Sequence, residues 1–268
     1  MADCDRPDNT LELVGWKSLA RSADLNMPSN PSPDSRTITF SRVVDLSRTV
    51  HPKIPVWPGD PSVELEDVAH IAGDGFFLRR FSMGEHTATH MNSPASFHAD
   101  GETIDAYLPE SLVAPAVVID VREETQADSD YALTIGAVKA WENIYGPIPA
   151  GSVVLLHTGW QEKWDSPCCY LGLDQHGHMS FPGFGVEAAC YLLSERGAAG
   201  LGIDTHGLEP GASEGFPVNS LALEQPRLAL ENLANLDRLP PTGAIIVIGI
   251  IRLEGGSGSP VSVLAFLP

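Results

Sequence analysis

The sequence of 268 residues has few basic residues and no long hydrophobic run, and each shortage excludes a class of protein. Only 16 Lys and Arg residues stand against 35 Asp and Glu residues, so the formal net charge is −19. Because such a surface repels phosphate backbones, we expect no nucleic-acid partner. The longest apolar run, residues 244–251, is far shorter than the roughly 20 residues of a membrane-spanning helix, so we expect no membrane partner.

Cysteine is scarce and poorly placed for disulfides. The four cysteines are Cys4, Cys168, Cys169 and Cys190. Two of them are adjacent, which disfavours a disulfide framework, and no CxxC pair is present, which disfavours a zinc knuckle. The N-terminus also lacks a basic segment followed by an apolar stretch, as a secretory signal would have. These features predict reduced thiols and a cytoplasmic protein.

Hydrophobic periodicity predicts the organisation of the chain. Residues 1–35 end in a stretch rich in Pro and Ser and are interpreted as an N-terminal extension, partly flexible. Residues 36–268 show no repeat or break in composition, so we predict a single domain. Buried or alternating runs predict strands at residues 42–47, 116–121, 152–156, 199–204, 244–252 and 261–266, and a hairpin at 62–83. Helical patterns cover residues 134–145 and 187–196, and together they predict an α/β fold with a mixed sheet and hairpins.

A histidine cluster is the most informative part of the sequence. His86 and His90 are four residues apart, and Asn92 and His98 follow. Imidazoles four apart can share one metal ion if the chain makes a tight turn, whereas in a straight strand they would lie about 13 Å apart. The HExxH motif of metalloproteases is not matched, because Thr87 follows His86. By spacing alone, one surface and one core histidine remain the alternative.

The cluster resembles the signature of the metal-dependent cyclase hydrolases, a family that includes bacterial kynurenine formamidase and isatin hydrolase. Their pattern is His-x-Gly-Thr-His-x-Asp-x-Pro-x-His, and His86, Thr89, His90 and Pro94 match it in register. Further similar segments follow in the family's order: Asp45-Leu-Ser, Trp57-Pro-Gly-Asp, Leu156-His-Thr-Gly-Trp, Gly202-Ile-Asp and Glu231-Asn-Leu-Ala-Asn-Leu. The resemblance covers residues 42–268 and implies a swivelling β/α/β-type fold, a homo-oligomer (dimer or tetramer), and a substrate pocket to which a neighbouring subunit contributes.

Several polar positions depart from the family pattern. Ala88 stands where the family has Gly, and Asn92 stands where it has an acidic metal ligand. Ser96 and Asn219 each stand where the family has a His. The resemblance therefore implies one divalent ion, zinc or manganese, rather than two. The predicted ligands are His86, His90 and Asn92, with His98 or a carboxylate (Glu85, Asp204, Glu209 or Glu231) as alternatives to complete the site.

The activity that the resemblance implies is hydrolysis of a linear or cyclic amide C–N bond in a small molecule by metal-activated water. His98 is the first candidate for the base and Glu231 the second. Candidate substrate contacts are Trp57, Phe76, Phe77, Phe97, Asp204 and Asn219, and the segment ending at His206 is a further candidate. Two alternatives stay open: an altered family member that binds a small molecule or metal without turnover, and lyase or dehydratase chemistry on the same scaffold.

Overall fold

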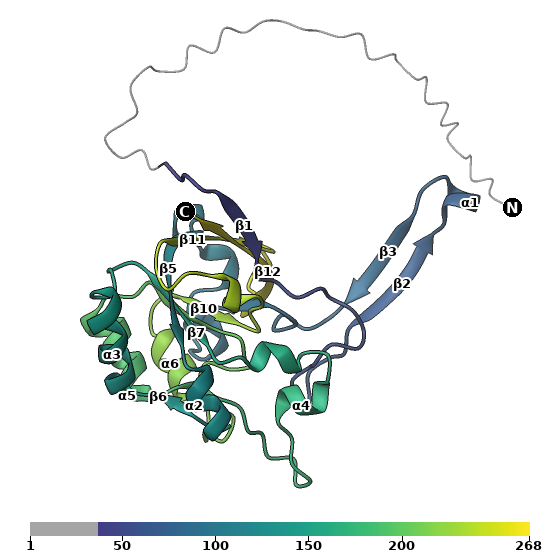
Figure 1. The fold of residues 1–268 in the computed structure, drawn as a ribbon. Helices are drawn as coiled ribbons and strands as arrows, with labels where there is room; N and C mark the ends of the chain where they lie inside the picture. Colours follow the sequence, from purple (N-terminus) through teal and green to yellow (C-terminus); the bar gives the residue numbers. More distant parts are fainter. Residues whose placement is uncertain (1–36) are drawn as a thin grey trace, which may run out of the picture. The chain divides into compact units, whose positions relative to one another are not determined.

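Runs of Val, Ile and Leu form the strands of one large mixed sheet (Figure 1). The computed structural model describes residues 37–268, so the predicted extension, residues 1–35, lies outside the described residues. The strands of the sheet are β1 (Arg42–Asp45), β4 (His90–Asn92), β5 (Val113–Asp120), β7 (Val153–His157), β9 (Gly200–Ile203), β10 (Leu228–Glu231), β11 (Ala244–Ile250) and β12 (Gly258–Leu267). The predicted α/β fold with a mixed sheet is confirmed.

The sheet closes on itself. Its strand order is β1-β12-β11-β5-β7-β9-β10-β4, and β4 pairs a second time with the start of β12. The pairs β5–β7, β7–β9 and β9–β10 are parallel, so these strands end at one edge of the sheet. Side chains that follow their carboxyl ends are therefore brought together, as is usual for sites in α/β proteins.

Two hydrophobic clusters lie on opposite faces of the sheet. Along β5, Ala116 and Val118 belong to the cluster inside the closed sheet, whereas Val117 and Ile119 belong to the cluster beneath the helices. Burial on both faces explains the continuous apolar runs of the parallel strands. The helices are α1 (Ile71–Asp74), α2 (Arg122–Ala127), α3 (Ile135–Tyr145), α4 (Pro167–Leu171), α5 (Val186–Cys190), which continues as a π-helical turn at Tyr191–Glu195, and α6 (Pro217–Ala222). None of the helices in residues 37–268 has the length and apolar character needed to cross a bilayer.

Two smaller sheets complete the fold. The predicted hairpin is present as β2 (Glu64–Ala69) and β3 (Leu78–Ser82), with α1 at its bend, and it extends from the domain in Figure 1. The other small sheet pairs β6 (Ala132–Leu133) with β8 (Gly183–Phe184). The hairpin exposes large apolar side chains, namely Val68, Ile71, Phe76, Phe77, Leu78 and Phe81.

A glycine in β9 allows the close approach of β10. A Cβ atom at Gly200 would lie 2.0 Å from the carbonyl oxygen of Leu228, its register partner. We expect Gly200→Ala to lower the free energy of unfolding by about 2–3 kcal/mol, because overpacking forces the backbone to shift. Urea unfolding will measure this, with Gly249→Ala as control, where the nearest atom lies 3.7 Å from the new Cβ. Equal effects of the two substitutions would contradict the expectation.

Candidate active site

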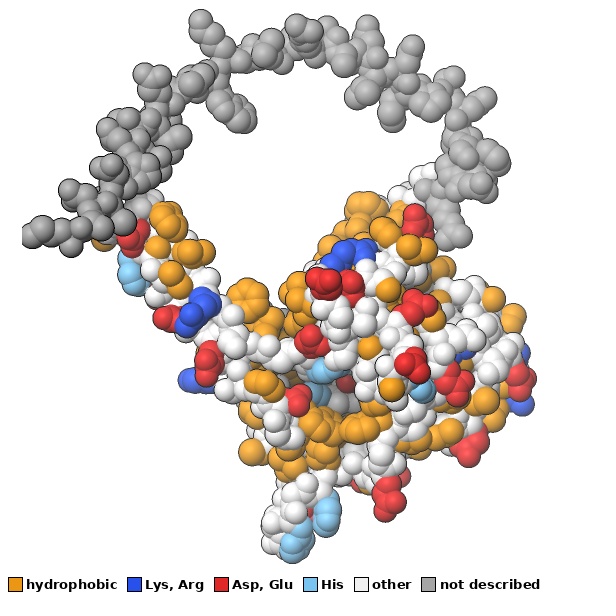
Figure 2. Space-filling model, turned by 180° about the vertical axis from the view of Figure 1, so that it is seen from behind, with side chains coloured by type: hydrophobic (Ala, Val, Ile, Leu, Met, Phe, Trp, Pro, Cys, Tyr) orange, Lys and Arg blue, Asp and Glu red, His pale blue; other side chains and the backbone are white. Residues whose placement is uncertain are grey.

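A pocket of about 230 Å³ lies beside β4 and β10. Its floor carries imidazole, amide and carboxylate groups and its wall is partly aromatic. Figure 2 shows a hollow of this kind, with histidine atoms inside it. The lining residues are Trp57, Asp60, His86, His90, Asn92, Ser96, Phe97, His206, Gly207, Glu209, Phe216, Asn219 and Glu231.

His90, the first residue of β4, has a fixed ring orientation. The chain turns at Glu85 and His86 and becomes extended at His90, as predicted for the histidine cluster. The buried ring of His90 places Nδ1 2.9 Å from the carbonyl oxygen of Ala88, which can only accept. Nδ1 therefore carries the proton, and Nε2 is directed to Oε2 of Glu231 at 3.2 Å.

The ring of His86 is held through Nε2, whereas the ring of His90 is held through Nδ1. Nε2 of His86 lies 3.0 Å from Oγ of Ser257, and Glu85 fixes Ser257 by accepting from its backbone N–H at 2.8 Å. Nδ1 of His86 lies 2.7 Å from Oδ1 of Asn92. Burial lowers the pKa of His86, and the neighbouring ring of His90 lowers it further. The two histidines thus present different nitrogens to the pocket, Nδ1 from His86 and Nε2 from His90.

Glu231 ends β10 directly opposite His90 in the antiparallel register. Its Oε1 accepts from the amide nitrogens of Asn92 at 3.1 Å and Asn219 at 2.9 Å. Burial alone would raise the pKa of Glu231, but the hydrogen bond and charge of His90 and the amide of Asn219 lower it to about 2. Glu231 is therefore a carboxylate at neutral pH, and its Oε2 is the oxygen without an amide donor.

Two further ionisable groups come from the segment between β9 and α6. Glu209 accepts from the backbone N–H groups of Val218 and Asn219 at 3.1 and 3.0 Å. Burial raises the pKa of Glu209 to about 7, with the charge of Glu231 acting in the same direction. Burial also lowers the pKa of His206 to about 4, with the ring of His90 contributing.

The structure brings most of the predicted site residues to the pocket. Those that line it are His86, His90, Asn92, Glu231, Asn219, Trp57 and Phe97. Sequence reasoning did not identify Phe216, whose ring lies 6.0 Å from Trp57 and 5.4 Å from Phe97 between centroids. Asp60 was not identified either, although it belongs to the Trp57-Pro-Gly-Asp motif and lines the pocket.

Four predicted residues lie outside the pocket, namely His98, Phe76, Phe77 and Asp204, and Phe77 is 54% exposed. The Nε2 atom of His98 lies 2.9 Å from the carbonyl oxygen of Ser220, and the ring lines a neighbouring depression instead. His98 is therefore not placed to act as base on a ligand in the pocket. Phe76 lies on the hairpin and is 55% exposed, so within this chain it does not contact the pocket.

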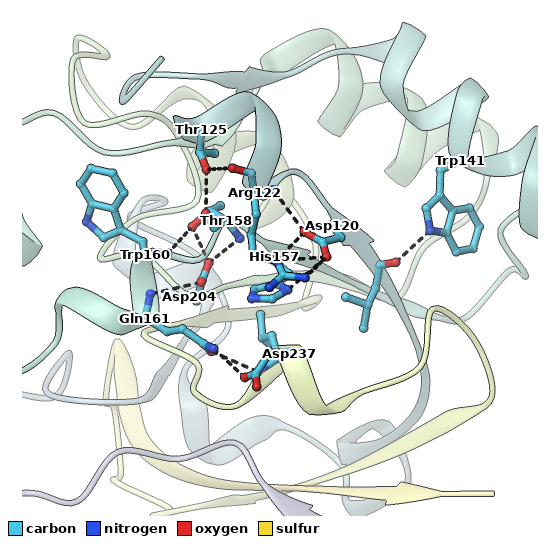
Figure 3. Close-up of polar contacts among 12 residues, drawn as sticks. Asp120, Arg122, Thr125, Trp141, His157, Thr158, Trp160, Gln161, Asp204 and Asp237 are labelled. Carbon is cyan, nitrogen blue, oxygen red and sulfur yellow. Dashed lines mark hydrogen bonds and ion pairs between the residues drawn. The ribbon is translucent and has the colours of Figure 1, made fainter. Parts of the chain in front are cut away.

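Asp204 is used in the scaffold rather than in the pocket wall (Figure 3). Its side chain is buried at the end of β9 and accepts from the backbone N–H of Thr158 at 3.0 Å, the hydroxyl of Thr158 at 2.6 Å and the N–H of Gln161 at 3.2 Å. Burial raises the pKa of Asp204. These bonds tie the ends of β7 and β9 together, and they support the loop that carries His206.

The donor set of the pocket fits one divalent cation. With Nδ1–H donated to Ala88, Nε2 of His90 faces Oε2 of Glu231 at 3.2 Å, a contact that either a proton on Nε2 or a cation shared by the two atoms would satisfy. A ligating histidine usually donates its other N–H to a carbonyl in this way. Within residues 37–268, no three His, Cys, Asp or Glu side chains form a group that could hold a metal ion. A cation here would therefore depend on the amide oxygen of Asn92.

The low pKa of His206 predicts a loss of stability in mild acid. The pKa of His206 is about 4 in the folded protein against 6.5 ordinarily, so the unfolded chain binds the proton first. The resulting stability is complete above pH 6.5 and is lost as the pH falls towards 4, by about 3 kcal/mol in total. Urea unfolding of ion-free protein at pH 7 and 4.5 will measure it. His206→Gln should remove most of this difference, and an unchanged difference would contradict the assignment.

Comparison with known proteins identifies the family. The Cyclase family model matches residues 44–210, and a curated isatin hydrolase from Roseibium aggregatum is 35% identical over 84% of this chain and 92% of its own length. The chain belongs to the cyclase family. A curated kynurenine formamidase from Sphingopyxis alaskensis is 26% identical over 83% of this chain and 96% of its own length. The solved structure of isatin hydrolase A from Ralstonia solanacearum superposes with a TM-score of 0.80 at 36% identity, covering 85% of this chain and 92% of that one.

The family match and the geometry of the pocket support different parts of the site. The matched range of the cyclase family contains His86, His90 and Asn92, and it ends at residue 210. Asn219 and Glu231 lie beyond it, so their assignment rests on the resemblance of residues 219–236 to the family pattern and on their hydrogen bonds with Asn92.

Proposed function

We propose that this cyclase-family protein hydrolyses the C–N bond of a linear or cyclic aryl amide. The observation that carries the proposal is the convergence of two oriented imidazoles and an anionic carboxylate at the floor of an aromatic-lined pocket. The similarity to proteins named isatin hydrolase and kynurenine formamidase supports the same reaction class. Both relatives act on small molecules, which agrees with a pocket of about 230 Å³.

One divalent ion, zinc or manganese, is the proposed cofactor, and His86, His90 and Asn92 would hold it. Nitrogen and oxygen donors of this kind suit either metal, and the neutral amide of Asn92 favours one ion over two. When bound, the ion supplies Lewis-acid polarisation of the substrate carbonyl and of water. Ser257 and Ala88 act on the two imidazoles from outside, because each fixes which ring nitrogen faces the pocket.

Glu231 is the group that we assign to proton transfer. Its Oε1 is occupied by the amides of Asn92 and Asn219, so Oε2 is the oxygen that can accept a proton from the attacking water. The same oxygen then returns the proton to the leaving nitrogen, and the amide is cleaved into a carboxylate and an amine.

The wall of the pocket favours an uncharged aromatic substrate. The ring of Phe216 lies 6.0 Å from that of Trp57 and 5.4 Å from that of Phe97 between centroids, and such a cluster suits stacking or edge contact with an aryl ring. Among the described residues that line the pocket, Asp60, Glu209 and Glu231 are acidic, and none is Lys or Arg. Neutral aryl amides should therefore bind better than analogues that carry a carboxylate.

We also propose that the protein forms a homo-oligomer, a dimer or a tetramer, in which the exposed hairpin is covered. Its apolar side chains, led by Ile71 at 72% and Phe81 at 60% exposure, form a surface that association would remove from water. Sedimentation of the purified protein will measure the assembly. We expect Phe76→Glu combined with Phe81→Glu to shift the protein to monomer, and a monomeric wild-type protein would contradict this part.

Turnover tests the proposed function. Purified protein, freed of metal and then supplied with zinc or manganese, is incubated with formanilide and with isatin, and hydrolysis is followed by absorbance. We expect ion-dependent turnover of at least one compound. Binding of both without turnover would favour an altered family member, for which the neutral Asn92 and Asn219 are the motivating residues. Elimination products would favour lyase chemistry.

A further inference from the structure

Two strained residues meet behind the ring of His90. Ala88 has φ 55° and Asn232 has φ 58°, both in the left-handed region that residues other than glycine rarely adopt. The side-chain amide of Asn232 donates to the carbonyl oxygen of Ala88 at 2.7 Å. The same oxygen accepts from Nδ1 of His90 at 2.9 Å, so one strained carbonyl serves both groups.

Asn232 is held on every side. Its backbone N–H donates to the carbonyl of Thr205 at 2.9 Å, and its carbonyl accepts from the hydroxyl of Thr89 at 2.7 Å. The carbonyl oxygen of Ala88 can only accept, so the amide nitrogen of Asn232 faces it, and Oδ1 of Asn232 lies 2.8 Å from the hydroxyl of Tyr170. Both Asn232 and Tyr170 are fully buried, so water does not compete for these bonds.

We propose that Asn232 is a positioning residue for His90. By holding the Ala88 carbonyl in its strained orientation, Asn232 keeps a hydrogen-bond acceptor at Nδ1 and directs Nε2 of His90 to Glu231. Asn232 does not line the pocket, and its amide nitrogen also lies 3.4 Å from Nδ1 of His90. The importance of Nε2 rests on the proposed function, whereas the geometry of the ring does not.

The geometry also explains why the strain persists at Ala88. Without a donor from Asn232, the peptide between Ala88 and Thr89 would be free to rotate towards an unstrained conformation. Its carbonyl would then leave Nδ1 of His90, and the ring would lose the bond that fixes its orientation. An asparagine suits this place because it tolerates a positive φ and carries a donor on a short side chain.

The test compares two asparagines of the same backbone class. Asn232→Gly keeps the positive φ accessible and removes the amide. The control is Asn235→Gly, since Asn235 has φ 56° and its amide donates to the carbonyl of Asp45 at 2.7 Å, away from the pocket. Asn232→Ala is the second variant, in case the glycine variant does not fold, and thermal unfolding checks both.

The first readout is hydrogen exchange of the Nδ1 proton of His90 in metal-free protein labelled with ¹⁵N-histidine. We expect exchange to become faster by about tenfold or more in Asn232→Gly and to stay unchanged in Asn235→Gly. The second readout is the Kd for Zn²⁺ by competition with a chelator, which we expect to rise by about 10–100-fold, as for other partners of metal-binding histidines.

A folded variant at position 232 whose Nδ1 proton exchanges as slowly as in the wild type would overturn the proposal. The exchange measurement needs neither metal nor substrate. If Asn232→Gly accelerates exchange but the wild type binds no Zn²⁺ and hydrolyses no aryl amide, the positioning role stands and the proposed function fails.

Discussion

Replacing both His86 and His90 by alanine is expected to abolish stoichiometric binding of zinc or manganese and hydrolysis of aryl amides. These residues supply the two imidazole nitrogens that face the pocket, and the remaining donors are oxygens of Asn92 and Glu231. The loss of a single orienting partner typically weakens metal binding by about 10–100-fold, so the loss of two ligands should cost more than about 10³-fold. Elemental analysis after dialysis measures the metal, and initial rates measure hydrolysis.

His98→Ala is the matched control for the double variant. Its ring is bonded to the Ser220 carbonyl and lies outside the pocket, so one equivalent of metal and near-normal rates should remain. The double variant must also unfold cooperatively, because His90 is buried. Full metal occupancy in the folded double variant would show that the ion is held elsewhere.

Glu231→Gln is expected to lower kcat by about 10²–10⁴-fold while KM changes little, which is the usual effect of losing a general base. Glutamine keeps the shape and can still bond with the amides of Asn92 and Asn219, but it has no anionic oxygen opposite His90. The substrate contacts on the aromatic wall are untouched, so binding of a neutral aryl amide should persist. Steady-state kinetics on the metal-loaded protein separate the two constants.

Glu110→Gln is a suitable control for the removal of one negative charge, because Glu110 lies exposed in the turn before β5. It should change kcat by less than about twofold, as expected for an exposed charge far from the reacting atoms. A Glu231→Gln variant that retains its metal and more than a third of the wild-type kcat would remove Glu231 from the proton-transfer step.

The strands and the core of the pocket could be predicted from the sequence because the information for them is local. Apolar runs gave β5, β7, β9 and β11 to within a few residues, and the alternating pattern gave the hairpin. The turn at His86 followed from the need to bring two imidazoles together and from Pro94 beyond it. The positions of Asn92 and Glu231 came from motifs whose spacing is fixed by the pairing of β4 with β10.

The remaining features depend on contacts between distant segments. His98 follows Pro94 by one turn, with its N–H donating to the Pro94 carbonyl, and this turn carries its ring towards Ser220 rather than into the pocket. The alternating hydrophobic pattern identified the hairpin, but it could not show whether Phe76 would be buried. In the structure, no described element covers Phe76. Ser257 and Asn232 lie more than 140 residues from the histidines that they orient, so no local pattern reveals their roles.

The most direct test of the central claim is anomalous diffraction at the manganese or zinc edge from crystals of the metal-loaded protein. The account predicts one anomalous peak per chain, in contact with His86, His90 and the amide oxygen of Asn92 and beside Glu231. An ion at full occupancy that contacts none of these residues, or the absence of any peak in protein that hydrolyses aryl amides, would contradict a one-metal site built on a neutral amide.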